Sequence, residues 1–231
     1  IKIDALDMER WGRAAILSGD TATAFQNFKT VIDNSDGKKC SLMYSYAYLL
    51  KEKKMYDESI QIYRKRIAAC NDSLSYKARL FIGLCYYSDN KPDSAVMSLR
   101  EFIQYEPGNL YGRVMLSNSF VALKMMDSSK KTLLEAYEIG KQNPGTNKRD
   151  IENVIGELCR IYLDAKDYTN LLKYSKSWSE INAESTTAYI YTAVAYQGMQ
   201  DKENACKNYR EVLKRDKENK VAKQNMKALG C

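Results

Sequence analysis

The chain has 231 residues, of which 45% are hydrophobic and 28% charged, and its 36 basic and 29 acidic residues give a net charge of +7. This composition indicates a globular chain, and no apolar run approaches the ~18 residues that a membrane-spanning helix needs. The sequence contains no histidine, which removes the commonest general base and the commonest metal ligand. We therefore expect no enzymatic activity, no cofactor, no metal site and no membrane span.

Small residues recur along the chain at spacings, by subtraction, of 35, 36, 34, 42 and 34 residues, in a first column formed by Gly12, Ala47, Gly83, Ser117, Cys159 and Ala193. A second column lies twelve residues later, with Leu171 as its exception: Ala24, Ser59, Ala95, Ser129, Leu171 and Ala205. Such a period is typical of solenoids, in which each unit buries its apolar face against its neighbours. Small residues at fixed places predict close crossings of helices.

Each unit is predicted to form two helices joined by a turn. In the third unit, residues 76–87 carry apolar side chains at helical spacing, and turn formers follow at 88–93. A second helix then runs until Pro107. Acidic residues such as Asp57 and Asp93 open the second helices, where the helix dipole favours negative charge.

The last unit shows the motif best, with Ala193, Tyr196, Ala205 and Tyr209. It resembles the tetratricopeptide repeat (TPR), a 34-residue helix-turn-helix unit with these small and aromatic positions. The resemblance covers nearly the whole chain and implies an all-α fold, a right-handed superhelical α-solenoid. We predict a single TPR domain over residues 1–231, with repeats at about 5–38, 40–73, 76–109, 110–143, 152–185 and 186–219, a capping helix at 220–231 and a loop insertion at 144–151.

In TPR proteins the first helix of each repeat lines a concave face, so the resemblance implies a binding groove there. Side chains of these helices that lie off the two columns form the predicted peptide-binding groove: Tyr44, Tyr48, Lys77, Leu80, Leu84, Tyr87, Tyr111, Val114, Asn118 and Val121. Tyrosine suits such a surface because its ring is rigid and apolar and its tip is polar. For the four tyrosines of this set, packing against neighbouring helices is an open alternative.

Some TPR domains clamp the C-terminal carboxylate of chaperones with basic and amide side chains on three consecutive repeats. The matching places of the first three repeats hold Glu9, Arg13, Tyr48, Leu80 and Leu84. This set lacks the clamp, so we do not expect an adaptor for chaperone tails.

The six cysteines include no CxxC motif, and Cys85, Cys159 and Cys206 fall on predicted packed faces, where free cysteine behaves as a small apolar residue. Cys40 and Cys70 lie at the same end of the second repeat and are a candidate disulfide. If bonded, they imply an oxidising compartment. Because the chain begins at residue 1 with Ile, we weigh an exported or cell-envelope protein whose signal has been removed against a cytoplasmic one.

The predicted function is a non-enzymatic scaffold that binds a peptide or helical segment of a protein partner in its concave groove. Two alternatives are nucleic-acid binding through the basic C-terminal helices and a sensory or assembly module of a larger protein. In residues 201–227 basic and acidic side chains alternate, which favours solvated helical faces over a phosphate-binding patch. The sequence does not name the partner, and it leaves a homo-oligomer open.

Overall fold

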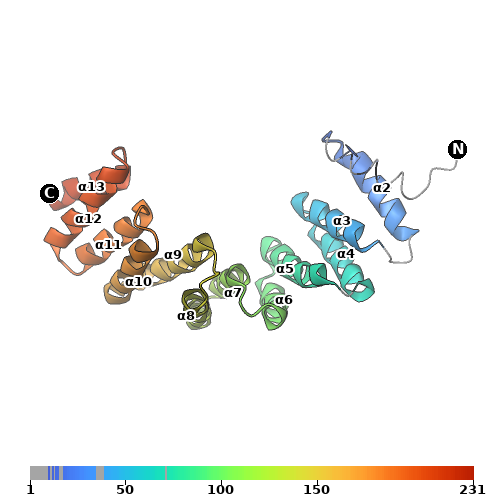
Figure 1. Ribbon diagram of the computed structural model, residues 1–231, viewed down its shortest axis with the longest axis horizontal. Helices are drawn as coiled ribbons and strands as arrows, with labels where there is room; N and C mark the ends of the chain where they lie inside the picture. The colour runs from blue at the N-terminus through green and yellow to red at the C-terminus, as the bar shows by residue number, and fades with distance from the viewer. Residues whose placement is uncertain (1–9, 11, 13, 16–17, 35–38, 71) are drawn as a thin grey trace. The chain divides into compact units, whose positions relative to one another are not determined.

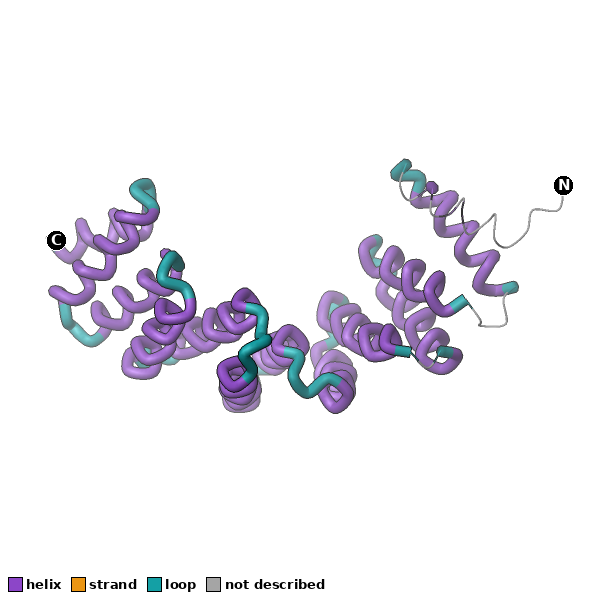
Figure 2. Tube along the Cα trace, in the orientation of Figure 1, coloured by secondary structure: helices purple, strands orange, loops and turns teal. Residues whose placement is uncertain are grey.

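The computed structural model describes residues 10, 12, 14–15, 18–34, 39–70 and 72–231. In that part of the chain every regular element is an α-helix, and short turns join successive helices (Figure 2). The helices group into two compact units, residues 1–124 (unit 1) and residues 125–231 (unit 2). The boundary falls inside the predicted fourth repeat, between its two helices, and each unit is described by itself.

The helices of unit 1 pack in chain order, each against the next (Figure 1). They are α2 (Thr21–Asp33), α3 (Cys40–Glu52), α4 (Tyr56–Ala69), α5 (Ser73–Ser88), α6 (Pro92–Tyr105) and α7 (Leu110–Ala122). In addition α3 contacts α5, and α5 contacts α7, whereas within the described residues α4 has no contact of comparable extent with α2 or α6. We call α3, α5 and α7 the inner layer and α2, α4 and α6 the outer layer, because a stack curves toward its more closely spaced side.

The turns inside the helical pairs share one backbone feature. Seven residues after each member of the first column lies a residue in the left-handed region, with φ between 56° and 80°: Gly19, Lys54, Asn90, Lys124, Lys166 and Gln200. A left-handed residue ends a helix by turning the next amide back toward a carbonyl of the last turn. The amide of Lys91 donates to the carbonyl of Tyr86, and that of Asp201 to the carbonyl of Tyr196, both at 2.9 Å. The backbone conformation therefore recurs with the same period as the sequence.

Acidic residues begin several second helices, as the sequence predicts. The side chains of Asp20, Asp167 and Asp201 accept hydrogen bonds from backbone amides of the first turns of α2, α10 (Tyr168–Ile181) and α12 (Lys202–Arg215). Such caps satisfy amides that have no partner inside the helix.

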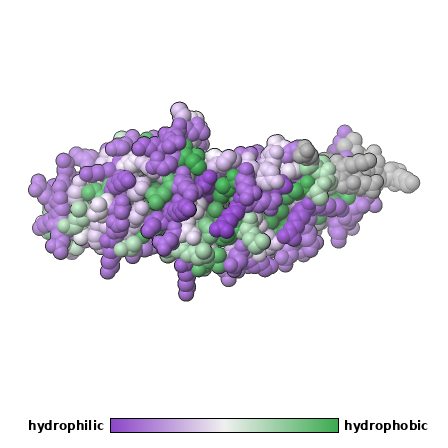
Figure 3. Space-filling view, turned by 90° about the horizontal axis from the view of Figure 1, so that it is seen from below, coloured by the Kyte–Doolittle hydropathy of each residue, from purple (hydrophilic) through white to green (hydrophobic). Residues whose placement is uncertain are grey.

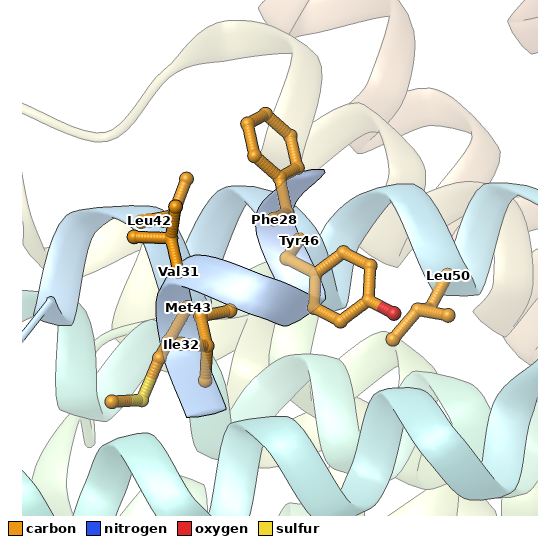
Figure 4. Close-up of a cluster of buried hydrophobic side chains, with 7 residues drawn as sticks. All are labelled: Phe28, Val31, Ile32, Leu42, Met43, Tyr46 and Leu50. Atoms are coloured by element: carbon orange, nitrogen blue, oxygen red, sulfur yellow. The ribbon is translucent and has the colours of Figure 1, made fainter. Parts of the chain in front are cut away.

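The core of unit 1 begins between α2 and α3, where seven buried side chains interlock (Figure 4): Phe28, Val31, Ile32, Leu42, Met43, Tyr46 and Leu50. The small-residue columns have the packing role that was predicted for them. Ala24, Ala47 and Ala95 are fully buried. A Cβ atom on Gly83 would lie 2.6 Å from Cγ of Leu99, so only glycine allows α5 and α6 to cross at this distance.

Unit 2 also packs each helix against the next. Besides α10 and α12 it contains α8 (Met126–Gln142), α9 (Lys148–Asp164), α11 (Thr186–Gly198) and α13 (Lys220–Leu229). The helix α13 covers the end of the core, since Met226 and Leu229 pack against the buried cluster that includes Tyr209. The segment predicted as a loop at 144–151 is only partly one. The side chain of Asn147 accepts a hydrogen bond from the amide of Arg149 at 2.8 Å, and this cap starts α9 within that segment.

Candidate functional site

Aromatic side chains from α3, α4 and α5 form a cluster at the inner layer of unit 1. The ring of Phe81 is its centre: it stacks on Tyr63 at 5.7 Å between centroids and meets Tyr44 and Tyr48 edge-on at 5.9 and 5.6 Å. Tyr44 also meets Tyr63 edge-on at 5.8 Å. Edge-on and stacked pairs at these separations are favourable arrangements of aromatic rings. Two of the predicted tyrosines are thus held in place by Phe81, which the sequence analysis did not select.

A lysine lies over the outer part of this cluster. The Nζ atom of Lys51 is 5.3 Å from the ring centre of Tyr48 and 5.8 Å from that of Phe81. It also pairs with Oε1 of the neighbouring Glu52 at 2.6 Å. A cation over a ring face is attracted by the ring quadrupole, so the two rings and the carboxylate together fix the lysine.

The ten predicted groove residues are exposed to different extents. Tyr48, Tyr87 and Tyr111 are exposed at 43%, 36% and 45%, and Lys77 is also exposed. Tyr44, Leu80, Asn118 and Val121 are half-buried. Leu84 and Val114 are buried, because the contacts of α5 with α3 and α7 cover the middle of the inner layer. These two belong to the interior of the unit, while the tyrosines and Lys77 reach its surface.

The hydroxyl groups of the surface tyrosines have no hydrogen-bond partner among the described residues: Tyr44, Tyr48, Tyr87 and Tyr111. By contrast, the hydroxyl of Tyr86, on the outer side of α5, accepts a hydrogen bond from Nη2 of Arg64 at 2.9 Å. We call the accessible side chains of the inner layer the tyrosine face: Tyr44, Tyr48, Lys51, Lys77, Phe81, Tyr87 and Tyr111. Its hydroxyls are available to a ligand.

Two cavities of unit 1 lie on the opposite side, between helices of the outer layer. One, of about 650 Å³, opens between α2 and α4 over Phe25, Tyr46 and Ile62. The other, of about 230 Å³, lies among α4, α5 and α6 and includes Arg79 and Ile82. None of the ten predicted groove residues lines either cavity. The tyrosine face therefore lies outside these two cavities.

Two pairs of cysteines are placed for disulfide bonds. Cys40 and Cys70 have Cα atoms 5.9 Å apart, in the second repeat, where the sequence analysis paired them. Cys206 and Cys231 are also 5.9 Å apart between Cα atoms, so Cys206 is not the free packing residue that the sequence analysis expected. Gly230, with φ of 67°, turns the chain so that Cys231 comes back beside α12.

The two remaining cysteines, Cys85 and Cys159, are free and fully buried. Burial raises the pKa of the Cys159 thiol to about 12 and also raises that of Cys85. Both therefore stay protonated at neutral pH, and a protonated thiol is a poor nucleophile.

The basic C-terminal helices carry paired charges. Glu211 binds Lys214 and Arg215, and Lys223 pairs with Glu218 at 2.8 Å. The guanidinium of Arg215 lies 4.3 Å from the ring centre of Tyr189. Ion pairs of this kind are typical of helical faces that are exposed to solvent. The surface in Figure 3 likewise mixes hydrophilic side chains with smaller hydrophobic areas.

The described residues contain no group of three side chains that could hold a metal ion. None of the described helices is both long and apolar enough to cross a bilayer.

Comparison with known proteins identifies the repeat. The tetratricopeptide repeat family matches residues 187–219. No protein of curated function matches the sequence. Among solved structures, MamA is 16% identical with a TM-score of 0.63, over 78% of this chain and 93% of MamA. YrrB, described as a TPR protein with an unusual peptide-binding site, is 15% identical with a TM-score of 0.62, over 87% and 97%.

A third similar structure is the Cut9–Hcn1 hetero-tetramer of the APC/C. It is 13% identical with a TM-score of 0.58, and the match covers 98% of this chain and 42% of the other. At these identities the likeness establishes a common fold, the TPR solenoid.

Proposed function

We propose that this chain, a tetratricopeptide-repeat protein, is a non-enzymatic scaffold that binds a peptide segment of a protein partner on the tyrosine face of unit 1. Solenoids offer extended inner surfaces to their partners, but a fold alone does not locate a site. The observation that carries the proposal is the exposure of Tyr48, Tyr87 and Tyr111 on the inner layer with hydroxyls that no described residue binds. Such side chains combine apolar area with a free polar group.

The available area is sufficient for binding of moderate strength. Burial of roughly 80 Å² on each of the three exposed rings, at about 25 cal/mol per Å², contributes about 6 kcal/mol before ordering costs. Hydrogen bonds from the free hydroxyls add to this and fix the register of the ligand. We therefore expect dissociation constants of tens to hundreds of micromolar for a segment that covers all three rings, after ordering costs.

The chemistry of the described residues supports a binding role and not a catalytic one. The sequence has no histidine, and the two free thiols are buried and protonated. In the basic C-terminal helices, Lys214, Arg215 and Lys223 pair with nearby acids, and acidic residues are interleaved with the other basic ones, so nucleic-acid binding is not proposed.

The test begins with a random 12-residue peptide library displayed on phage, selected on the immobilised full chain. Enriched peptides are synthesised with a fluorophore, and their affinity is measured by anisotropy for the wild type and for Tyr48→Ala with Tyr87→Ala. We expect the double variant to bind at least ten-fold more weakly, because it loses two of the three exposed rings.

The matched control is Tyr105→Ala, which removes a ring of similar exposure, 47%, from the outer helix α6. It should bind within two-fold of the wild type. Circular dichroism melts confirm that all variants are folded. Failure to enrich any peptide, or equal weakening by Tyr105→Ala, would rule out the tyrosine face as the binding surface.

A further inference from the structure

Resting on this proposed function, we infer that the tyrosine face selects peptides in which internal acidic side chains flank the apolar anchors. The inference concerns the charge of the partner, which the exposure of the rings leaves undecided. It comes from the way in which charged residues are divided between the two layers of unit 1.

The inner layer of unit 1 is poor in acidic residues. The helices α3, α5 and α7 hold one acidic side chain, Glu52, and four basic ones: Lys51, Lys77, Arg79 and Arg113. The outer helices α4 and α6 hold four of each kind: Asp57, Glu58, Asp93 and Glu101, and Arg64, Lys65, Arg66 and Arg100. Acids are thus depleted from the inner layer and not from the unit as a whole.

Among the inner basic residues, Lys77 is the one available to a ligand. It is exposed, it precedes Phe81 by one helical turn, and it makes no hydrogen bond or ion pair with a described residue. Arg79 is turned toward the outer layer instead. Its Nε donates to Oε1 of Glu101 at 2.9 Å, and its guanidinium lies 4.4 Å from the ring centre of Tyr105. Lys77 therefore gives the tyrosine face a positive charge that no described acid pairs with.

Lys51 adds a second positive charge beside the rings of Tyr48 and Phe81, and only Glu52 compensates it. An apolar side chain that packs on these two rings would place its neighbours near both lysines. A carboxylate there gains attraction from the lysines and hydrogen bonds from the free tyrosine hydroxyls. A lysine or arginine there meets like charge, and one carboxylate does not offset it.

The recognised acids should be internal to the peptide. Of the five places that clamp a terminal carboxylate in chaperone-binding TPR domains, Glu9 and Arg13 lie outside the described residues, and the other three, Tyr48, Leu80 and Leu84, hold no cation. Leu84 is also buried. The tyrosine face therefore has no described cation at the places that would hold a chain end, whereas Lys51 and Lys77 lie beside the rings, where side chains inside a bound peptide would pass.

The experiment uses three synthetic peptides that share the apolar anchors of one library-selected sequence. Their flanking positions are all Asp, all Asn or all Lys, and each C-terminus is amidated so that no terminal carboxylate is present. At ~50 mM salt we expect the Asp peptide to bind about five-fold more tightly than the Asn peptide and the Lys peptide to bind most weakly. The differences in affinity among the three peptides should become smaller at ~500 mM salt, because exposed charges are then screened.

Two variants of the full chain test the residues. Lys77→Gln should weaken the Asp peptide about three-fold and leave the Asn peptide unchanged, and Glu52→Gln should strengthen the Asp peptide about two-fold. The matched controls, Lys65→Gln and Glu58→Gln, make the same charge changes at exposed positions of the outer helix α4 and should change neither affinity.

The outcomes separate this inference from the proposed function. Equal affinity for the Asp and Asn peptides, or tightest binding of the Lys peptide, overturns the acidic preference. If affinity then still falls in the variant with Tyr48→Ala and Tyr87→Ala, the tyrosine face remains the binding surface but has no preference for acidic peptides. If the Lys77→Gln variant prefers the Asp peptide over the Asn peptide as strongly as the wild type does, Lys77 does not cause the preference, and its assignment to Lys77 is overturned. Failure of the wild type to bind any selected peptide removes the proposed function itself.

Discussion

Unit 1 and unit 2 are built from the same helical hairpin but use their tyrosines differently. In unit 1 four tyrosines are exposed: Tyr48, Tyr87, Tyr105 and Tyr111. In residues 125–231, all of which the structure describes, each of the eight tyrosines is buried or half-buried. The hydroxyl of Tyr137 there shares a hydrogen bond with Ser177 at 2.7 Å, and that of Tyr209 donates to Gln197 at 3.0 Å. Unit 1 therefore exposes four of its ten tyrosines, whereas unit 2 exposes none of its eight.

The difference shows which positions of the repeat are free to vary. The columns and the buried aromatic positions are constrained by helix packing in both units. Some first-helix positions off the columns, such as Leu84 and Val114, are also buried, but others reach the surface and carry no such constraint. In α9 of unit 2 one of them is occupied by Arg160, which pairs with Glu157 at 2.6 Å, whereas in α3 and α5 of unit 1 they carry tyrosines. A ligand is therefore to be sought first on unit 1.

The largest effect is expected at Arg66, a fully buried arginine of unit 1; within residues 125–231 no charged side chain is buried. Its guanidinium donates to the carbonyl of Cys40 at 3.0 Å, to Oγ of Ser75 at 3.0 Å and to both carboxylate oxygens of Asp72 at 2.6 and 2.8 Å. Arg66→Ala removes these bonds and leaves a cavity, so the free energy of unfolding should fall by about 3 to 5 kcal/mol. Urea denaturation measures this, with the exposed Arg64→Ala, expected to cost less than ~1 kcal/mol, as control.

The pH dependence of the same variant checks the ion pair. The hydrogen bond from Arg66 lowers the pKa of Asp72 below its ordinary value of 3.8. Because the folded pKa is depressed, the stabilisation is complete above pH 3.8 and is lost as the pH falls through the lowered value. The stability gap between wild type and Arg66→Ala should therefore narrow below pH 3.8. A gap that stays constant down to pH 2 would mean that Asp72 contributes nothing through Arg66.

Each unit also contains one cysteine pair, and we expect both pairs to be bonded in protein from an oxidising compartment. The pairs span 30 residues in unit 1 and 25 residues in unit 2. Loops of this length predict that each bond stabilises its unit by about 3 kcal/mol, so a reductant should lower the melting temperature in both units. Alkylation in denaturant, followed by intact-mass measurement, should modify two cysteines before reduction and six after it. Six modified cysteines without reductant would show that neither bond exists.

The helices and columns could be predicted because close packing leaves a local mark in the sequence. A small residue every 34 to 42 positions records a helix crossing whatever its neighbours are. The pairing of Cys206 with Cys231 left no such mark. It depends on the left-handed turn at Gly230 after the cap helix, which brings the chain end back to α12.

The candidate site was harder to predict because helical periodicity gives the direction of a side chain and not its depth. Leu84 and Tyr87 lie on the same helix and were both assigned to the groove, yet the first is 7% exposed and the second 36%. How deeply a side chain is buried depends on how closely α3, α5 and α7 approach one another, and this distance is set by the packing of all the helices of unit 1. For the same reason Phe81 and Lys51, which complete the tyrosine face, were not selected.

Glycines offer a sharper comparison of packing in the two units. A Cβ on Gly83 would lie 2.6 and 2.7 Å from side-chain atoms of Leu99, whereas on Gly156 it would lie 3.2 Å from the edge of Trp178. Gly83→Ala should therefore cost about 1 to 3 kcal/mol. Gly156→Ala should change the free energy of unfolding by close to zero, because the ~1 kcal/mol gain in helix propensity offsets the mild crowding. Thermal melts compare them, and equal losses would mean that the first column is no tighter than other helical positions.

The smallest expected effect is the change in the free energy of unfolding when a buried tyrosine hydroxyl is removed, and its sign should differ between the two units. Tyr63 and Tyr209 occupy the same repeat position, four residues after Ser59 and Ala205, and both are fully buried. The hydroxyl of Tyr63 has no hydrogen-bond partner among the residues that the structure describes, whereas that of Tyr209 donates to Oε1 of Gln197 at 3.0 Å. An unpaired buried hydroxyl costs free energy, so Tyr63→Phe should raise the free energy of unfolding by about 1 kcal/mol, and Tyr209→Phe should lower it by a similar amount. Urea denaturation of both variants measures the pair. A loss of stability in Tyr63→Phe would mean that its hydroxyl is satisfied after all, and the two positions would then be equivalent in energy as well as in sequence.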